Sequence, residues 1–217
     1  MNPPALNSKP VVEPVDEANL PEFALFLHTH LQRNRSPKQW ETGLRAQWAA
    51  NQPNFGFVLR HNAEIVGGIG AYYADRLIHG QPQAFCNITS WCVLDAFRQQ
   101  SMRLAMAVIS QPGYHFTDFS PTKIVGGTLK FFKFKELDER VVVLLNAPHL
   151  LRGGVQVLHR PADIQAQLTD GALKIYQDHA VYQWLQHVLL GQAGRWVHLI
   201  YKRMDFKGLP AAKVLYV

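Results

Sequence analysis

The sequence contains only two cysteines among its 217 residues, Cys86 and Cys92. They stand six positions apart in a segment that reads as a strand, which would separate them by about 20 Å at roughly 3.3 Å per residue. Because a disulfide needs Cα atoms within about 7 Å, a regular strand excludes an intrachain bridge. There is also no CxxC pair and the ten histidines are scattered, so no zinc framework and no metal are expected.

Long hydrophobic runs are absent too. The longest aliphatic run, residues 141–145, falls far short of the roughly 18–20 residues that span a bilayer. The amino-terminal segment MNPPALNSKP lacks the basic-then-apolar order of a signal peptide. The sequence therefore predicts a cytoplasmic protein that does not associate with membranes.

The composition has 47% hydrophobic and 18% charged residues, which is typical of a soluble globular protein. The length suffices for one sizeable core, or for one domain with a smaller appendage. A net charge of +6 favours an anionic ligand. No strand interleaves aromatic and basic residues on one face, so nucleic-acid binding would depend on charge alone and no nucleic-acid partner is expected.

Hydrophobic periodicity predicts an α/β fold with a mixed sheet, in which an antiparallel front joins a β-α-β core. The expected elements are a strand at 11–15, helices starting near Leu20 and at Ser36-Pro37, a hairpin over 55–74, a strand at 84–93, a helix after Ser101, a strand at 115–119, a helix capped by Ser120, and a closing strand at 140–145.

The carboxy-terminal third suggests an internal repeat. Residues 188–212 line up with residues 58–84, since both run strand, Gln/Asn-Ala turn, strand, basic stretch and Gly-x-Pro-x-Ala. Two unrelated hairpins that share turn chemistry are the alternative. The predicted organisation is a disordered tail at 1–10, one domain at 11–146, and a partial repeat of helix and strands at 147–217, through which a homodimer could form.

Residues 93–104, VLDAFRQQSMRL, carry the clearest functional pattern. The segment contains the end of a strand, an arginine, two glutamines and a serine that caps the following helix. A turn of this kind would direct its free backbone N–H groups toward a ligand. The favoured ligand at such a turn is a phosphate group. An ordinary capped turn without a ligand is the alternative.

The order of elements over about residues 11–145 resembles that of the GNAT superfamily of acyl-CoA-dependent N-acyltransferases. Two segments also resemble that family, SWCVLDAFRQQSMRLAMAVI and FSPTKIVGGTLKFFKFKEL. The resemblance implies a GNAT-like fold with an additional C-terminal helix and β-hairpin. In that family the loop after the fourth strand reads Arg/Gln-x-x-Gly-x-Gly/Ala. This chain matches at Arg98 but has Ser101 and Arg103 at the two small positions, and FKF at 132–134 has Lys133 where many members have glycine.

The resemblance also implies where acetyl-CoA or another acyl-CoA binds as co-substrate. Backbone groups of the fourth strand would pair with the pantetheine chain, and the turn that follows would hold the diphosphate. The residues so implied are Trp91, Cys92, Val93, Arg98, Gln99, Gln100, Ser101, Met102 and Arg103. Arg103 would either turn outward, contact the phosphates or partly block the cleft.

Candidates for proton transfer follow from the same resemblance. A glutamate on the fourth strand is the base in one branch, and Asn87 stands near that place here, where it cannot act as a base. His115, Asp118 and Ser120 are further candidates, although each also has a structural explanation as a strand, turn or cap residue.

Two functions are consistent with these observations. The first is an N-acyltransferase enzyme, most simply an acetyltransferase, in which a primary amine of a small molecule attacks the thioester directly. The second is a non-catalytic acyl-CoA-binding or protein-interaction module on a degenerate GNAT fold, consistent with Asn87 and Arg103.

Overall fold

The computed structural model describes residues 9–46, 48–138, 140–145, 154–192 and 194–217. The chain divides into two compact units, residues 1–138 and 139–217. The boundary expected at 146/147, and all but the last two residues of the expected disordered tail at 1–10, lie outside the described residues. Among the helices described, none is both long and apolar enough to cross a membrane.

The first unit contains a five-stranded sheet in the order β1-β2-β3-β4-β5. Neighbouring strands from β1 to β4 are antiparallel, whereas β5 runs parallel to β4. The strands are β1 (Val11–Pro14), β2 (Gly56–His61), β3 (Glu64–Ile78), β4 (Gln81–Val93) and β5 (His115–Thr117). The antiparallel front and the β-α-β core expected from the sequence are thus confirmed.

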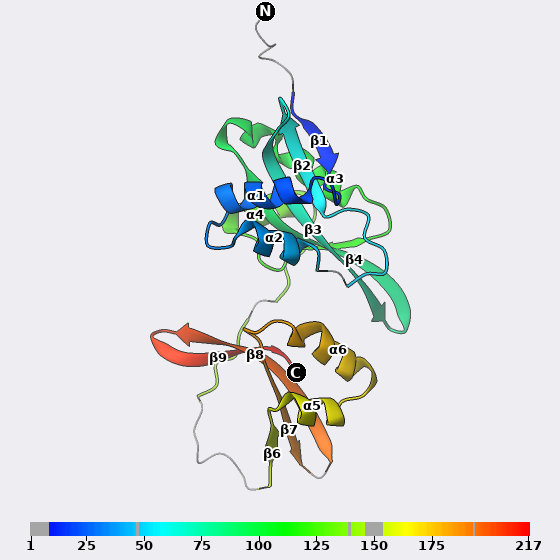
Figure 1. Ribbon diagram of the computed structural model, residues 1–217, viewed down its shortest axis with the longest axis vertical. Coiled ribbons are helices and arrows are strands. Elements are labelled where there is room, and N and C mark those ends of the chain that lie inside the picture. The colour runs from blue at the N-terminus through cyan, green and yellow to red at the C-terminus, as the bar shows by residue number, and fades with distance from the viewer. Residues whose placement is uncertain (1–8, 47, 139, 146–153, 193) are drawn as a thin grey trace, which may run out of the picture. The chain divides into compact units, whose positions relative to one another are not determined.

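Helices cover both faces of this sheet (Figure 1). On one face α1 (Leu20–His30) and α2 (Pro37–Leu44) pack against Val58 and Ile65. On the other face α3 (Ser101–Ile109) and α4 (Lys123–Phe131) pack against Leu59, Ile69 and Ile88. The alternation of buried side chains along β2 and β3 therefore supplies two separate hydrophobic layers.

Helix α2 starts as the Ser36-Pro37 signal predicts. The Ser36 hydroxyl accepts the Gln39 backbone N–H, and the Gln39 side chain accepts the Ser36 backbone N–H. This capping box satisfies two donors at the helix start. Helix α4 differs, because its cap is Thr122, whose hydroxyl accepts the Val125 N–H, and not the expected Ser120.

Helix α4 ends in a left-handed residue. Lys133 has φ of +65°, its N–H donates to the Lys130 carbonyl, and the Phe134 N–H donates to the Leu129 carbonyl. These two bonds define a Schellman motif, in which glycine is the usual residue at the left-handed position. Lys133 therefore stands where the backbone itself favours the glycine found in many GNAT members.

The strand expected at residues 140–145 is wrong, since this stretch has no strand hydrogen bonding. Its five aliphatic side chains, from Val141 to Leu145, are all exposed. High β-propensity makes a segment able to pair, but pairing also needs an available neighbour. The edge of the first sheet is instead formed by the three-residue strand β5.

The second unit has the same element order as the start of the first, namely strand, two helices and three strands. Its elements are β6 (Gln156–Leu158), α5 (Pro161–Gln167), α6 (Asp170–Ala180), β7 (Gln186–Gln192), β8 (Arg195–Phe206) and β9 (Leu209–Tyr216). The sheet order is β6-β7-β8-β9 and every pairing is antiparallel. It thus contains more than the one helix and hairpin expected beyond the GNAT-like domain.

Two histidines lie in the interior of the second unit. The Nδ1 atom of His187 on β7 and the Nε2 atom of His198 on β8 lie 3.2 Å apart, with the rings stacked. Tyr176 of α6 and Tyr216 of β9 contact the pair. Besides burial, the charges of His187 and His179 lower the pKa of His198, whereas a hydrogen bond with His179 partly offsets the lowered pKa of His187. Burial is the main cause that lowers the pKa of His198, to about 4, and it also lowers that of His187.

Replacing Lys133 by glycine should stabilise the first unit. A non-glycine residue in the left-handed region costs about 1 kcal/mol, so Lys133→Gly should raise the free energy of unfolding by about that amount. Urea unfolding monitored by circular dichroism measures the change. Lys133→Ala is the matched control, because it removes the charge but keeps the left-handed strain, and an equal gain in that variant would contradict the explanation.

The second unit should lose stability in mild acid. The folded-state pKa of His198 lies below the unfolded value of about 6.5, so the unfolded chain binds the proton more tightly. The stability that the neutral ring contributes is complete above pH 6.5 and is lost as the pH falls toward 4. The free energy of unfolding should be about 2 kcal/mol lower at pH 5 than at pH 7.5. In His198→Gln this pH dependence should shrink, and an unchanged slope would refute the assignment.

Candidate functional site

A fork between β4 and β5 is the central feature of the candidate site. β5 pairs with β4 only over Phe85–Asn87, opposite His115–Thr117. β4 then continues from Ile88 to Val93 while staying paired with β3 on its other side. Among the described residues no strand pairs with this part of β4 on the β5 side. Its backbone is therefore available to a ligand that lies alongside, as the resemblance implies for Trp91, Cys92 and Val93.

A β-bulge lies within the unpaired part of β4. Gly68 is opposite Cys92 and Gly70 is opposite Thr89, so Ser90 and Trp91 together face Ile69. Ser90 has φ of +51°, which marks the extra residue. The bulge reverses the side-chain alternation, because Trp91 packs on the α3 and α4 side whereas Cys92 packs on the α1 and α2 side.

The turn after β4 is more helical than the sequence pattern predicts. A 3₁₀ helix, η1 (Asp95–Gln100), leads directly into α3. Ser101 is consequently the first residue of α3 and not its cap, and its N–H donates to the Arg98 carbonyl. The residue at the cap position, Gln100, has helical backbone angles and makes no side-chain cap bond.

The two arginines of the turn have different partners. Arg98 is exposed and donates to Asp95 at 2.7 Å, so it remains on the outside of η1. Arg103 donates to the Pro10 carbonyl at 2.6 Å and to Gln100 at 3.1 Å. Arg103 thus ties α3 to the chain that enters β1, which gives this side chain a structural role. Gln99 and Met102 are exposed beside them.

The structure places the proton-transfer candidates at different points of the fork. Asn87 lies at its apex, where its Oδ1 accepts the Thr117 hydroxyl at 3.1 Å and its Nδ2 donates to the Ile88 carbonyl at 3.2 Å. His115 lies at the other end of the β4–β5 pairing, exposed and 2.8 Å from the Gln83 side chain. Thr117 was missed in the sequence, although it lies between two candidates.

Asp118 and Ser120 follow β5 directly. The Asp118 carboxylate accepts the Ser120 N–H at 3.0 Å, and Ser120 is exposed in a bend. Burial raises the pKa of Asp118, partly offset by that hydrogen bond. Asn87 and Thr117 therefore meet where β5 leaves β4. Asp118 is the next residue along the chain, and its carboxylate is bonded to the Ser120 N–H, whereas His115 lies at the other end of the pairing.

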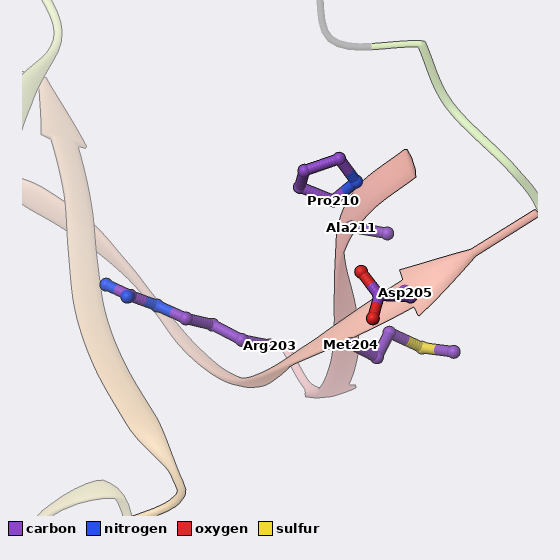
Figure 2. Close-up of a pocket in the computed structure, with 5 residues that line it drawn as sticks. All are labelled: Arg203, Met204, Asp205, Pro210 and Ala211. Atoms are coloured by element: carbon purple, nitrogen blue, oxygen red, sulfur yellow. The ribbon is translucent and has the colours of Figure 1, made fainter. Parts of the chain in front are cut away.

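No group of three or more histidine, cysteine or acidic side chains in the described part of the chain is arranged to hold a metal ion. A pocket of about 320 Å³ lies in the second unit between β8 and β9, lined by Arg203, Met204, Asp205, Pro210 and Ala211 (Figure 2). Figure 2 shows the Arg203 side chain directed away from Asp205. None of the sequence-predicted site residues lines this pocket.

Comparison with known proteins addresses the fold. No family model matches the sequence, and no curated protein matches it. Among solved structures, N-myristoyltransferase of Saccharomyces cerevisiae with bound myristoyl-CoA is similar, with a TM-score of 0.50 and 11% identity over 99% of this chain and 67% of that chain. A GCN5-related N-acetyltransferase from Anabaena variabilis has a TM-score of 0.55 and 10% identity over 95% of this chain and 57% of that chain.

The fork, the bulged fourth strand and these similarities show that the chain has a GNAT-like fold. It spans 57% to 67% of the length of the two solved structures. The fold expected from the motifs at 90–109 and 119–137 is thereby confirmed.

Both cysteines are free, as the sequence predicts, and neither is suited to be a nucleophile. Burial raises the pKa of Cys86 to about 12 and also raises that of Cys92. Because the thiolate is the reactive form, Cys86 in the folded protein should react with a disulfide reagent at pH 8 about a thousandfold more slowly than in urea. Spectrophotometric thiol titration, with Cys92→Ala to isolate Cys86, measures this, and rapid labelling of the folded protein would contradict it.

Proposed function

We propose that the protein is an acyl-CoA-dependent N-acyltransferase, which transfers an acyl group, most simply acetyl, to a primary amine of a small molecule. The observation that carries the proposal is the unpaired backbone of β4 from Ile88 to Val93 beside the start of α3. A ligand that contains amide groups in an extended chain can pair with this strand edge as another strand would. The pantetheine part of coenzyme A has this chemistry.

The residues present fit the anionic end of such a ligand. After the single residue Leu94, β4 is followed by η1, which leads directly into α3, and the positive end of this helical segment favours a negatively charged group near the end of the strand. Arg98 is exposed beside the turn, held by a surface ion pair that contributes little free energy and can exchange partners. Arg103 departs most from the family pattern, but its guanidinium donates a hydrogen bond to the Pro10 carbonyl. This bond directs the side chain toward β1.

Polarisation of the thioester carbonyl would come from whichever backbone N–H groups among Trp91, Cys92 and Val93 point to the β5 side, where no described strand pairs with them. Such preorganised donors stabilise the negative charge that develops on the oxygen when an amine attacks. The attacking amine must first lose a proton. Asn87 is an amide and cannot accept it, and its two hydrogen bonds to Thr117 and Ile88 give it a positioning role at the apex.

Asp118 is the group we propose for proton removal. It lies directly after β5 and next to the apex residue Thr117. Burial raises the pKa of this carboxyl, which brings it closer to the working pH that favours a general base. The hydrogen bond that the Asp118 carboxylate accepts from the Ser120 N–H also fixes the orientation of this side chain.

A non-catalytic acyl-CoA-binding module is the second candidate, favoured by the amide of Asn87 at the position of a carboxylate in one branch of the family. The two functions differ in chemistry. An enzyme releases free coenzyme A only when an amine acceptor is supplied, whereas a binding module releases none across a panel of amines.

A charge placed at the start of α3 should separate ligand binding from folding. Ser101→Asp adds a carboxylate near the proposed diphosphate, where repulsion at roughly 5 Å costs on the order of 3 kcal/mol at an effective dielectric of about 20. The dissociation constant for acetyl-CoA, measured by calorimetry, should rise tenfold or more. Ser101→Asn has nearly the same shape without the charge and should bind like the native protein.

The same acid at a helix start stabilises the helix, so the fold should be retained in Ser101→Asp. Equal affinities for Ser101→Asp and Ser101→Asn would refute the diphosphate position. Absence of any acetyl-CoA binding to the native protein would refute the proposed function itself.

A further inference from the structure

Three polar side chains form a hydrogen-bonded cluster in the interior of the first unit. The Tyr73 hydroxyl donates to the Asn54 Oδ1 atom at 2.8 Å, the Asn54 Nδ2 atom donates to the Gln111 Oε1 atom at 2.8 Å, and the Gln111 Nε2 atom donates to the Tyr73 hydroxyl at 2.9 Å. Tyr73 is fully buried and Asn54 is 8% exposed. Each member of this polar cluster donates to one member and accepts from another, so the cluster is closed on itself.

The polar cluster joins parts of the chain that are far apart in sequence. Asn54 lies in the segment that enters β2, Tyr73 lies on β3, and Gln111 follows the end of α3. Loss of one member would leave its partners buried without a hydrogen bond, which costs more free energy than an ordinary hydrogen bond contributes. The cluster therefore holds these parts in one arrangement.

Gln111 is anchored by its backbone as well as by its side chain. Its N–H donates to the Val108 carbonyl at 3.2 Å, and its Nε2 atom donates to the same carbonyl at 3.1 Å. Only residues 112–114 separate Gln111 from the start of β5. The point at which the chain enters β5 is therefore fixed by the polar cluster.

Tyr114, the last residue before β5, adds a contact with the same cluster. Its ring packs edge-on against the Tyr73 ring with the centroids 5.1 Å apart, and it lies 6.4 Å from the Phe116 ring of β5. Tyr73 is also the sheet partner of Cys86, which in turn is the partner of Phe116. Tyr73 thus lies in line with the central residue pair of the β4–β5 pairing.

β5 depends on such contacts because its own pairing is short. It pairs with β4 over three residues, and no strand of the described chain pairs with its other side. So short a strand has few hydrogen bonds to resist a shift, so contacts at its two ends determine its direction. The polar cluster supplies the contact at its start, and the hydrogen bond from Thr117 to Asn87 supplies the contact at its end.

We propose that Asn54, Tyr73 and Gln111 are positioning residues, which set the direction of β5 and thereby the width of the fork between β4 and β5. None of the three side chains needs to touch a ligand, since they act through β5. The consequence for acyl-CoA binding rests on the proposed function, whereas the consequence for β5 does not.

Gln111→Met tests the proposal, because it removes the amide that links the polar cluster to β5 and nearly keeps the length of the side chain. The backbone N–H groups that join β4 to β5 should exchange with deuterium about tenfold faster, because buried polar groups lose their partner. Residue-resolved NMR measures these rates. The N–H groups that join β1 to β2 should keep their rates, and the dissociation constant for acetyl-CoA, measured by calorimetry, should rise about fivefold or more.

Ile65→Val is the matched control for a loss of stability alone. It removes one buried methyl group from the layer beneath α1 and α2, and it should change neither the exchange rates between β4 and β5 nor the affinity. Tyr73→Phe removes only the hydroxyl, so it is the milder second variant if Gln111→Met does not fold, and both effects should have the same direction.

Two results would overturn the proposal. One is faster exchange that is equal between β4–β5 and β1–β2, which is a general loss of stability. The other is faster exchange at β5 alone with an unchanged dissociation constant for acetyl-CoA. A native protein that binds no acetyl-CoA would refute the proposed function and the link to the ligand, and the exchange rates would then decide the effect on β5 by themselves.

Discussion

The difference between the two sides of β4 determines most of what the first unit can do. On one side, β4 is hydrogen bonded to β3 from the hairpin near Ile78 to the pairing of Val93 with Gly67. On the other side, the pairing with β5 stops at Asn87. A strand that is held firmly along one edge keeps its position while its other edge remains open, so a ligand proposed to pair with that edge would meet a backbone that is already in place.

The supports of β4 explain why other residues are where they are. The β-bulge at Ser90 lets Trp91 and Val93 pack with α3 and α4, although Cys86 and Ile88 already occupy that layer further along the strand. α1 lies so close to β3 that a Cβ atom at Gly68 would come within 2.3 Å of the Phe23 ring. The sheet is thus held from both faces at the point where β4 lacks a neighbour.

Much of the fold could be predicted from local chemistry, and the errors have physical causes. The Ser36-Pro37 start of α2 and the hairpin between β2 and β3 rely on interactions within a few residues, so the sequence predicts them well. Ser120 and Thr122 flank Pro121 and both can cap a helix, and local sequence does not decide between them. The 3₁₀ helix η1 was missed because Ser101 has the chemistry of a cap, whereas the chain already turns helical at Asp95.

The candidate site shows the same division between local and long-range information. The residue types around Arg98 and the strand before them identify the region, but the partner of Arg103 is the Pro10 carbonyl, 93 positions away. The hydrogen bond from Thr117 to Asn87 joins two strands separated by a helix. Likewise, the valines and leucines at 141–145 have the propensity of a strand, but propensity carries no information about which edge is open to them.

The bulge at Ser90 also constrains how the chain can vary. If Ser90 were instead a regular strand residue, Trp91 would turn to the side of the sheet where the Phe23 ring already fills the space above Gly68. A large indole cannot be accommodated there without displacing α1. The extra residue in the bulge is therefore what keeps the indole in the layer formed with α3 and α4.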